Sequence, residues 1–268
     1  MSELKYIVAD CGGTSTNWAF CYEESEVTVK TETMHPKYLL ESGQEKRDSI
    51  RAKLPEDVSA PLYFYSSGCT NTDIAGRMQE VLTRMGFSDV TVLPDTIGAC
   101  RACCGDSPGR VAILGTGSVL LDYDGQEVTG RTGGWGSLIG DEGGGFHFGR
   151  LLLQAYLSGR ITDDWLPGII GTEQEIQARL ATPDAQRWIS TLAAKTAGLD
   201  LTALHRTNIR AFINMHLQGG AGSGGTLAVV GSYGWYQRDV LAEELSREGW
   251  ECAAVIRDPL PKLVIYHS

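Results

Sequence analysis

The chain of 268 residues lacks the marks of several large protein classes. It has no run of about 18 consecutive apolar residues, so no membrane-spanning helix and no membrane partner are expected. Its 23 Lys and Arg are outnumbered by 33 Asp and Glu, and the net charge of −10 disfavours binding to the phosphate backbone of nucleic acids. Low-complexity tracts and long blocks of one charge are also missing, which argues against disorder. The first residues lack the apolar core of a secretory signal, so a cytoplasmic protein is expected.

The seven cysteines do not form the pattern of a disulfide framework, because they are odd in number and irregular in spacing. Cys100, Cys103 and Cys104 form the one close group. No second C-x-x-C pair follows it, as a zinc or iron–sulfur site would require. We therefore interpret the group as small apolar side chains of a helix.

Short apolar strands alternate with glycine turns and helices, which predicts an α/β fold in two halves, 1–107 and 108–268. The first half has expected strands at 6–9, 18–22, 27–31, 62–65 and 90–93, and helices at 44–54 and 74–85. The second half has expected strands at 110–114, 119–123, 126–130 and 226–230, helices at 149–157, 173–180, 184–197, 201–217 and 239–248, a glycine-rich loop at 219–225 and a closing apolar segment at 262–266. Both halves begin strand, glycine turn, strand and hairpin, which suggests two similar half-structures.

Three apolar strands run into glycine turns that carry hydroxyl side chains: Asp10–Thr16, Gly115–Ser118 and Gly231–Ser232. Glycines allow backbone N–H groups to approach an anion closely, and the hydroxyls add donors. A carboxylate such as Asp10 beside a phosphate-binding turn suits Mg²⁺, which binds a few carboxylates together with substrate phosphates. A turn-capping role for Asp10 is the alternative reading.

Asp95 follows a short strand and Pro94, at the point where a helix is expected to begin. A carboxylate at the carboxyl end of a strand in an α/β fold is well placed to act as a general base. Asp is also a preferred helix N-cap, and position alone leaves both readings open.

Three motifs in this order carry a family resemblance: Asp10-x-Gly-Gly-Thr-x-Thr16, Gly115-Thr-Gly-Ser118 and Gly134-Trp-Gly-x-x-x-Gly-Asp-Glu-Gly143. Together they resemble the N-acetylglucosamine kinase family of the sugar-kinase, actin and heat-shock-chaperone ATPase superfamily, whose bacterial branch includes activator ATPases. The segment Ser66–Thr70, Asp95 and Val230–Ser232 also match, so the resemblance covers the whole chain. It implies two ribonuclease-H-like (actin-like ATPase) domains, 1–107 and 108–268, around a central nucleotide cleft that holds ATP and Mg²⁺.

The resemblance also assigns roles to residues. It implies that Asp95 is the general base of a kinase and that Asp10 holds the metal. The first phosphate loop would consist of Asp10, Gly12, Gly13, Thr14 and Thr16, the second of Gly115, Thr116 and Gly117, and the adenosine-side junction of Gly231 and Ser232. The sugar would be bound by Ser118, Trp135, Gly136, Asp141 and Glu142.

Two departures from the family pattern affect the expected sugar contacts. Val119 stands where the family usually has Asn, and Met34-His35-Pro36 replaces an asparagine-containing segment. We therefore expect an ATP-dependent kinase of an amino sugar, most closely N-acetylglucosamine-like, that forms homodimers as the family commonly does. The alternatives are an activator-type ATPase of a radical dehydratase and a non-catalytic sugar-sensing protein of the same fold.

Overall fold

The computed structural model describes residues 3–217 and 224–268, and the chain divides into two compact units. The first unit comprises Met1–Ser107, Gly125–Val128 and Asp258–Ser268, and the second comprises Pro108–Asp124 and Thr129–Arg257. The units are not continuous in sequence, because Gly125–Val128 and Asp258–Ser268 belong to the first, so the division into domains 1–107 and 108–268 stays a prediction. Most of the glycine-rich loop expected at 219–225 lies outside the described residues.

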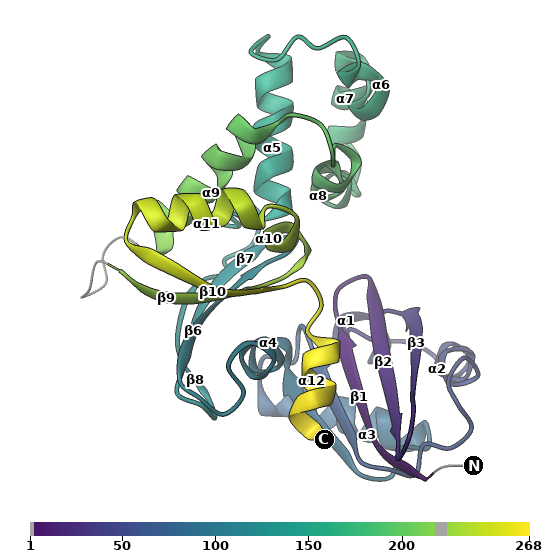
Figure 1. The fold of residues 1–268 in the computed structure, drawn as a ribbon. Helices are drawn as coiled ribbons and strands as arrows, with labels where there is room; N and C mark the ends of the chain where they lie inside the picture. The colour runs from purple at the N-terminus through teal and green to yellow at the C-terminus, as the bar shows by residue number, and fades with distance from the viewer. Residues whose placement is uncertain (1–2, 218–223) are drawn as a thin grey trace. The chain divides into compact units, whose positions relative to one another are not determined.

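The first unit contains a five-stranded mixed sheet in the order β3-β2-β1-β4-β5 (Figure 1). Its strands are β1 (Leu4–Cys11), β2 (Ser15–Tyr22), β3 (Glu26–Glu32), β4 (Leu62–Ser66) and β5 (Val90–Pro94). The first three strands pair antiparallel, and β4 and β5 run parallel to β1. The carboxyl ends of β1, β4 and β5 therefore share one edge of the sheet, where both Asp10 and Asp95 lie.

Both faces of this sheet are covered by apolar side chains. Alternate residues of β1 point to opposite faces, so they belong to different clusters. Ile7, Ala9 and Cys11 join one apolar cluster, which includes side chains of α1 (Pro36–Leu39), α2 (Gln44–Arg51) and α3 (Thr72–Arg84). Val8 joins the opposite cluster, to which Ala102 of α4 (Asp95–Cys104) and Leu260 and Leu263 of α12 (Leu260–His267) contribute. Because both faces are buried, the apolar residues of β1 are consecutive in the sequence and do not alternate with polar ones.

The second unit repeats the strand order of the first. Its sheet runs β10-β9-β6-β7-β8, and it consists of β6 (Gly109–Leu114), β7 (Ser118–Tyr123), β8 (Val128–Gly133), β9 (Gly225–Val230) and β10 (Trp250–Ile256). As in the first unit, an antiparallel pair is followed by two strands that run parallel to the first. The expected pair of similar half-structures is confirmed at the level of topology.

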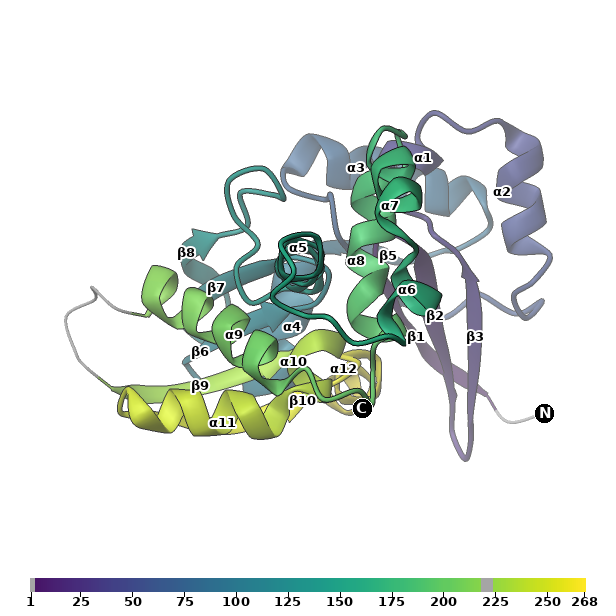
Figure 2. The same ribbon diagram turned by 90° about the horizontal axis from the view of Figure 1, so that it is seen from above.

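Helices of the second unit contribute to two separate apolar clusters. They are α5 (Gly145–Leu157), α6 (Leu166–Ile170), α7 (Glu173–Leu180), α8 (Ala185–Lys195), α9 (Thr202–His216), α10 (Ser232–Tyr236) and α11 (Arg238–Arg247). Side chains of α9 and α11 pack on the sheet, and α5 to α8 form a separate apolar cluster. Figure 2 looks along α5, with α8 on one side and α9 on the other. None of the helices within the described ranges combines the length and apolarity needed to cross a bilayer.

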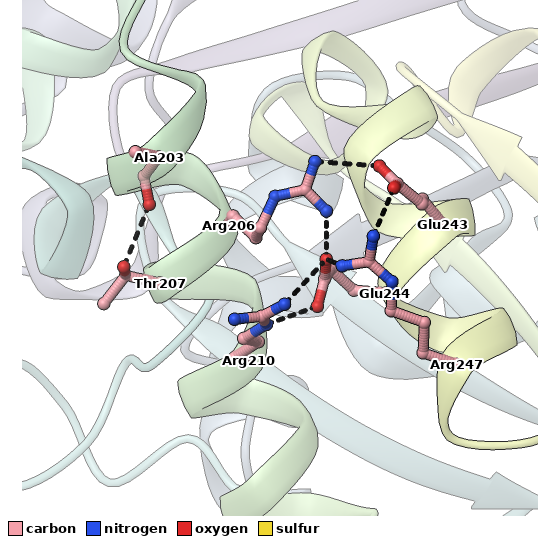
Figure 3. A network of polar contacts seen from close by, with 7 residues as sticks. All are labelled: Ala203, Arg206, Thr207, Arg210, Glu243, Glu244 and Arg247. Atoms are coloured by element: carbon pink, nitrogen blue, oxygen red, sulfur yellow. Dashed lines mark hydrogen bonds and ion pairs between the residues drawn. The ribbon is translucent and has the colours of Figure 1, made fainter.

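A charged network holds α9 against α11 (Figure 3). Glu244 is 2% exposed and accepts hydrogen bonds from Arg206, Arg210 and Arg247. Burial raises the pKa of this carboxyl, but the hydrogen bonds from Arg210 and Arg206 outweigh it, so its pKa lies below the ordinary value. Glu243, which is more exposed, pairs with Arg206 and Arg247.

Candidate nucleotide and sugar sites

The first glycine turn joins β1 to β2 and is open. The N–H of Gly12 donates to the carbonyl of Ser15 at 3.0 Å, and Gly13 and Thr14 are exposed at the tip. An added Cβ on Gly13 would meet no atom within 4 Å. Thr16, in contrast, is fully buried, and its Oγ1 accepts the N–H of Met34 at 3.0 Å. The exposed tip is therefore available to a ligand, whereas Thr16 anchors the chain behind it.

Asp10 ends this strand in a negatively charged environment. Burial raises its pKa to about 7, and the charges of Asp258 and Asp95 add to the shift. A divalent cation would relieve this repulsion, so the donor set fits the expected Mg²⁺. No group of three or more Asp, Glu, His or Cys within 3–217 and 224–268 could hold a metal on its own. The ion would therefore need further ligands from nucleotide phosphates and water.

Asp95 is the first residue of α4, directly after β5. Pro94 occupies the N-cap position, so Asp95 lies one residue inside the helix. Its charge contributes to the raised pKa of Asp10, which places the two carboxylates in one electrostatic neighbourhood of the first unit.

The second glycine turn, between β6 and β7, is backed by the start of α5. The N–H of Gly145 donates to the carbonyl of Gly115, and that of Phe146 to the carbonyl of Thr116, each at 2.8 Å. A Cβ on Gly144 would lie 2.8 Å from backbone atoms of the turn. The helix starts at Gly145, four residues before the start predicted from the sequence, and the N–H groups of its first two residues bond to the turn.

The third junction lies beside the second. Gly231 has a positive φ of 122°, and a Cβ there would lie 2.5 Å from the carbonyl oxygen of Leu114 at the end of β6. Its N–H donates to the carbonyl of Ile256 at 2.8 Å. Only glycine allows this close approach of β9 to β6.

The two junctions line a pocket of about 300 Å³ within the second unit. One wall consists of small residues, including Ala193 and Ala194 of α8 and Ala197, two residues after the helix ends. Tyr236 is 54% exposed, and the guanidinium of Arg257 lies 5.2 Å from its ring centre. The full lining is Gly115, Thr116, Gly145, Ser190, Ala193, Ala194, Ala197, Ser232, Tyr233, Tyr236, Gln237 and Arg257. Sequence reasoning found Gly115, Thr116 and Ser232 but assigned no ligand to Tyr236, and no motif marks the alanines of α8.

The loop from Gly134 to Gly143 is fixed to the second turn through Asp141. This residue is 8% exposed and has a positive φ of 69°, a strained conformation for a residue other than glycine. Its Oδ1 accepts the N–H of Ser118 at 3.2 Å and occupies the space that a side chain on Gly117 would need. Burial raises the pKa of Asp141, and the hydrogen bond from Ser118 opposes the shift.

Asn208 on α9 holds the end of this loop and was missed by sequence reasoning. The side chain is fully buried, its Oδ1 accepts the N–H of Gly143 at 2.9 Å, and its Nδ2 donates to the carbonyl of Gly144 at 3.0 Å. The Nδ1 of His147 lies 2.6 Å from the same Oδ1. This contact gives His147 a structural role beside the loop.

The other residues expected to bind sugar differ in exposure. Trp135 is 52% exposed and Gly136 is also exposed, so both are accessible to a ligand. Ser118 is buried, and its hydroxyl is one of the buried polar atoms without a hydrogen-bond partner in the described structure. Glu142 turns toward α9. Val119 is buried and offers no polar group.

His35, the second departure from the family pattern, has a structural role in the first unit. It caps α1, where its Nδ1 accepts the N–H of Lys37 at 3.1 Å. Its ring also lies against Gly68, whose φ is +85° and whose Cβ would overlap the imidazole. The Ser66–Thr70 segment is thereby packed next to His35.

The cysteines of α4 behave as apolar side chains. Cys100 is buried, Cys103 and Cys104 are half-buried, and all seven cysteines are free. Burial raises the pKa of Cys100 and of Cys103 to about 12, so both remain thiols at neutral pH.

The fold is that of the actin-like ATPase superfamily. A protein of Porphyromonas gingivalis provisionally named N-acetylglucosamine kinase superposes with a TM-score of 0.81 and 26% identity, over 98% of this chain and 98% of that one. A ROK family glucokinase of Streptomyces griseus, solved with glucose and AMPPNP, superposes with a TM-score of 0.51 and 15% identity, over 95% and 94% of the two chains. The expected fold class is thus confirmed, and the Streptomyces griseus structure is an example of this fold with AMPPNP bound.

Sequence comparison points to one family within this superfamily. The chain is 42% identical over 52 residues to N-acetyl-D-glucosamine kinase of Dictyostelium discoideum, and 28% identical over 93 residues to N-acetylmuramic acid/N-acetylglucosamine kinase of Clostridium acetobutylicum. These matches cover 19% and 34% of this chain but span only 16% and 30% of the two curated relatives. No family model matches the chain. Together with the Porphyromonas structure, the matches confirm the resemblance to the N-acetylglucosamine kinase family.

Proposed function

We propose that the protein is an ATP- and Mg²⁺-dependent kinase that phosphorylates a hydroxyl of an amino sugar resembling N-acetylglucosamine. The observation that carries the proposal is the pocket of about 300 Å³ at Gly115, Thr116 and Ser232, whose turn is tied through Asp141 to the loop expected to bind sugar. The second unit thus contains both the pocket proposed for the nucleotide and the loop proposed for the sugar, and the hydrogen bond from Ser118 to Asp141 joins them. Such preorganisation suits phosphoryl transfer, which depends mainly on positioning and charge neutralisation.

In this proposal the second unit binds the adenosine and the sugar. The small side chains of α8 and the exposed ring of Tyr236 would accept the flat base. Trp135 would pack against one face of the sugar, and Asp141 with Glu142 would accept hydrogen bonds from its hydroxyl groups. Ser118 and Gly136 would complete the sugar contacts.

The carboxylates of the first unit would supply the chemistry. Asp95 would take the proton of the attacking hydroxyl as general base, and Asp10 would hold Mg²⁺ directly or through water. Bound Mg²⁺ neutralises charge on the transferred phosphoryl group. The exposed turn at Gly12, Gly13 and Thr14 would donate backbone N–H groups to the phosphates.

The amino-sugar assignment rests on the family resemblance and has to account for Val119. A buried valine cannot hydrogen-bond an acetamido group, and the family's usual asparagine could. Discrimination between an N-acetylated and a free amino sugar must then come from side chains other than Val119.

The test is release of ADP from ATP with Mg²⁺, measured with N-acetylglucosamine, glucosamine, glucose, N-acetylmannosamine and muramic acid. Strong stimulation by an amino sugar is expected, with the phosphorylated sugar found by mass spectrometry. Turnover that is independent of every sugar would favour an activator-type ATPase. The absence of both turnover and phosphorylated product would favour a sugar sensor.

A further inference from the structure

His216, the last residue of α9, is a buried histidine to which no role has yet been assigned. Its side chain is 1% exposed, and neither ring nitrogen has a hydrogen-bond partner in the described part of the chain. The Oε2 of Glu142 is also buried without a hydrogen bond, and it lies 4.0 Å from the Nε2 of His216. Two complementary buried groups thus face each other slightly beyond hydrogen-bond distance.

His216 contacts the sugar-side loop near both of its ends. A Cβ on Gly133, just before the loop, would lie 2.9 Å from the imidazole Cε1. The ring of Trp135 lies 6.0 Å from that of His216, centre to centre, and Glu142 lies at the other end of the loop. Phe212, one turn earlier on α9, packs against the imidazole from the helix side. The histidine is therefore held from behind while the loop residues lie in front of it.

Two polar side chains beside Glu142 and His216 already have partners. Asp141 accepts from the amide of Ser118, and Asn208 binds both Gly143 and Gly144. The unpaired Glu142 and His216 stand out, because leaving buried polar groups unsatisfied is unfavourable. A movement of about 1 Å would bring their atoms to hydrogen-bond distance. The loop thus has one unmade contact that a small displacement would complete.

We propose that sugar binding draws Glu142 onto His216, and that the resulting hydrogen bond fixes the loop carrying Trp135, Asp141 and Glu142 in its sugar-binding position. His216 is in this sense a positioning residue, since it acts on the sugar through Glu142. The inference rests on the proposed function, because it assumes that this loop binds the sugar.

The test compares His216→Phe, which removes the donor but keeps a planar ring, with His216→Gln, whose amide can still donate. Met215→Gln, at a half-exposed neighbouring position of α9, is the matched control. His216→Phe should raise the KM for N-acetylglucosamine or glucosamine about tenfold, with the KM for ATP unchanged. His216→Gln should recover most of the loss, and Met215→Gln should equal the parent.

A second measurement reports on the loop without turnover. Titration with the same sugar should change tryptophan emission, and the part that disappears in Trp135→Phe belongs to Trp135. That part should be lost in His216→Phe and retained in His216→Gln. The double variant His216→Phe with Glu142→Ala should be no worse than the more impaired single variant, because each substitution removes one partner of the same hydrogen bond.

The outcomes separate this inference from the proposed function. If the parent shows neither sugar-dependent ADP release nor an emission change, the sugar-kinase proposal fails, and the inference fails with it. If the parent responds but His216→Phe binds sugar equally well, or the two substitutions act additively, the inference alone is overturned. Should His216→Phe not fold, His216→Leu, which also lacks a donor, replaces it in the comparison with Glu142→Ala and their double variant.

Discussion

The two units share one strand order but differ in what they bury. The buried polar residues described in the first unit are the hydroxyl residues Thr16, Thr31 and Ser66. The second unit also buries carboxylate, amide and imidazole side chains, namely Asp141, Asn208, His205 and Glu244. Apolar packing suffices to build the first sheet with both faces covered, whereas the second unit uses buried polar groups to fix helices and one loop. The same topology thus supports a scaffold in one case and a shaped binding surface in the other.

The glycine turns show the same contrast. The tip of the first turn is surrounded by open space at Gly13, whereas the second is pressed against α5 at Gly144. The carboxylates Asp10 and Asp95 lie in the first unit, and the pocket lies in the second. The comparison predicts that substitutions in the first unit change chemistry with little effect on folding, and that equivalent changes in the second affect folding and binding together.

The largest effect is expected for Asp95→Asn. Loss of the general base should lower kcat by roughly 10²–10⁴-fold, while affinity for ATP stays close to that of the parent. Steady-state kinetics and nucleotide binding by calorimetry measure the two quantities. Asp89→Asn, an exposed position before β5, is the control. Retained turnover in Asp95→Asn would remove this residue from the role of base.

The next largest effect is expected in the charged network between α9 and α11. Substitutions there test whether the stability of the second unit depends on buried polar groups. Glu244→Ala removes the buried partner of three partly exposed arginines and should cost about 1.5–3 kcal/mol in free energy of unfolding, measured by denaturant titration. Glu243→Ala, whose carboxylate is 47% exposed, should cost much less, because water screens its ion pairs. Equal losses of unfolding free energy in the two variants would contradict the expected difference between the buried and the exposed glutamate.

A third comparison uses one added methyl group in each turn region. Gly144→Ala should destabilise the protein by about 1–3 kcal/mol, since its Cβ would overlap the backbone of Gly117. Gly13→Ala should leave the unfolding temperature unchanged and still raise the KM for ATP, because it crowds the surface expected to receive phosphate. Both effects are checked by thermal unfolding and steady-state kinetics of the two variants. A destabilised Gly13→Ala would show that the first turn is not open.

The smallest effect concerns the pH dependence of Asp10. Its pKa in the folded state, about 7, exceeds the ordinary value of 3.8, so the folded protein holds an extra proton between these values and loses stability as the pH rises through them. Asp10→Asn cannot ionise and should unfold roughly 2–4 °C higher than the parent at pH 8, with a smaller difference near pH 5. Saturating Mg²⁺ and ATP should stabilise the parent more than the variant. A constant difference across pH would show that Asp10 titrates normally.

Much of the scaffold could be predicted from the sequence, because apolar strands and glycine turns are local signals. β10 could not, since Ala253 and Ala254 have little strand propensity and the following apolar segment at 262–266 is a helix that packs on the other sheet. The three glycine turns of the candidate site were found for the same local reason.

The supporting residues of the site could not be found this way. Asn208 binds Gly143 across 65 positions of the chain, and neither it nor His216 belongs to a motif. The alanines of α8 resemble any small-residue helix surface until the pocket is known. The backbone segments that would contact the ligand could thus be predicted from the sequence, but the side chains that hold those segments in place could not.

The docking of α12 on the first sheet has a consequence for synthesis of the chain. Leu260 and Leu263 complete the apolar cluster that contains Val8, Ala19 and Tyr65. On the ribosome, the strands of the first sheet emerge long before these leucines, and one face of the sheet lacks part of its cover while the whole second unit is being made. The first unit can therefore reach its final packing only after the second has been translated, so the nascent first sheet is a surface that chaperones would have reason to bind.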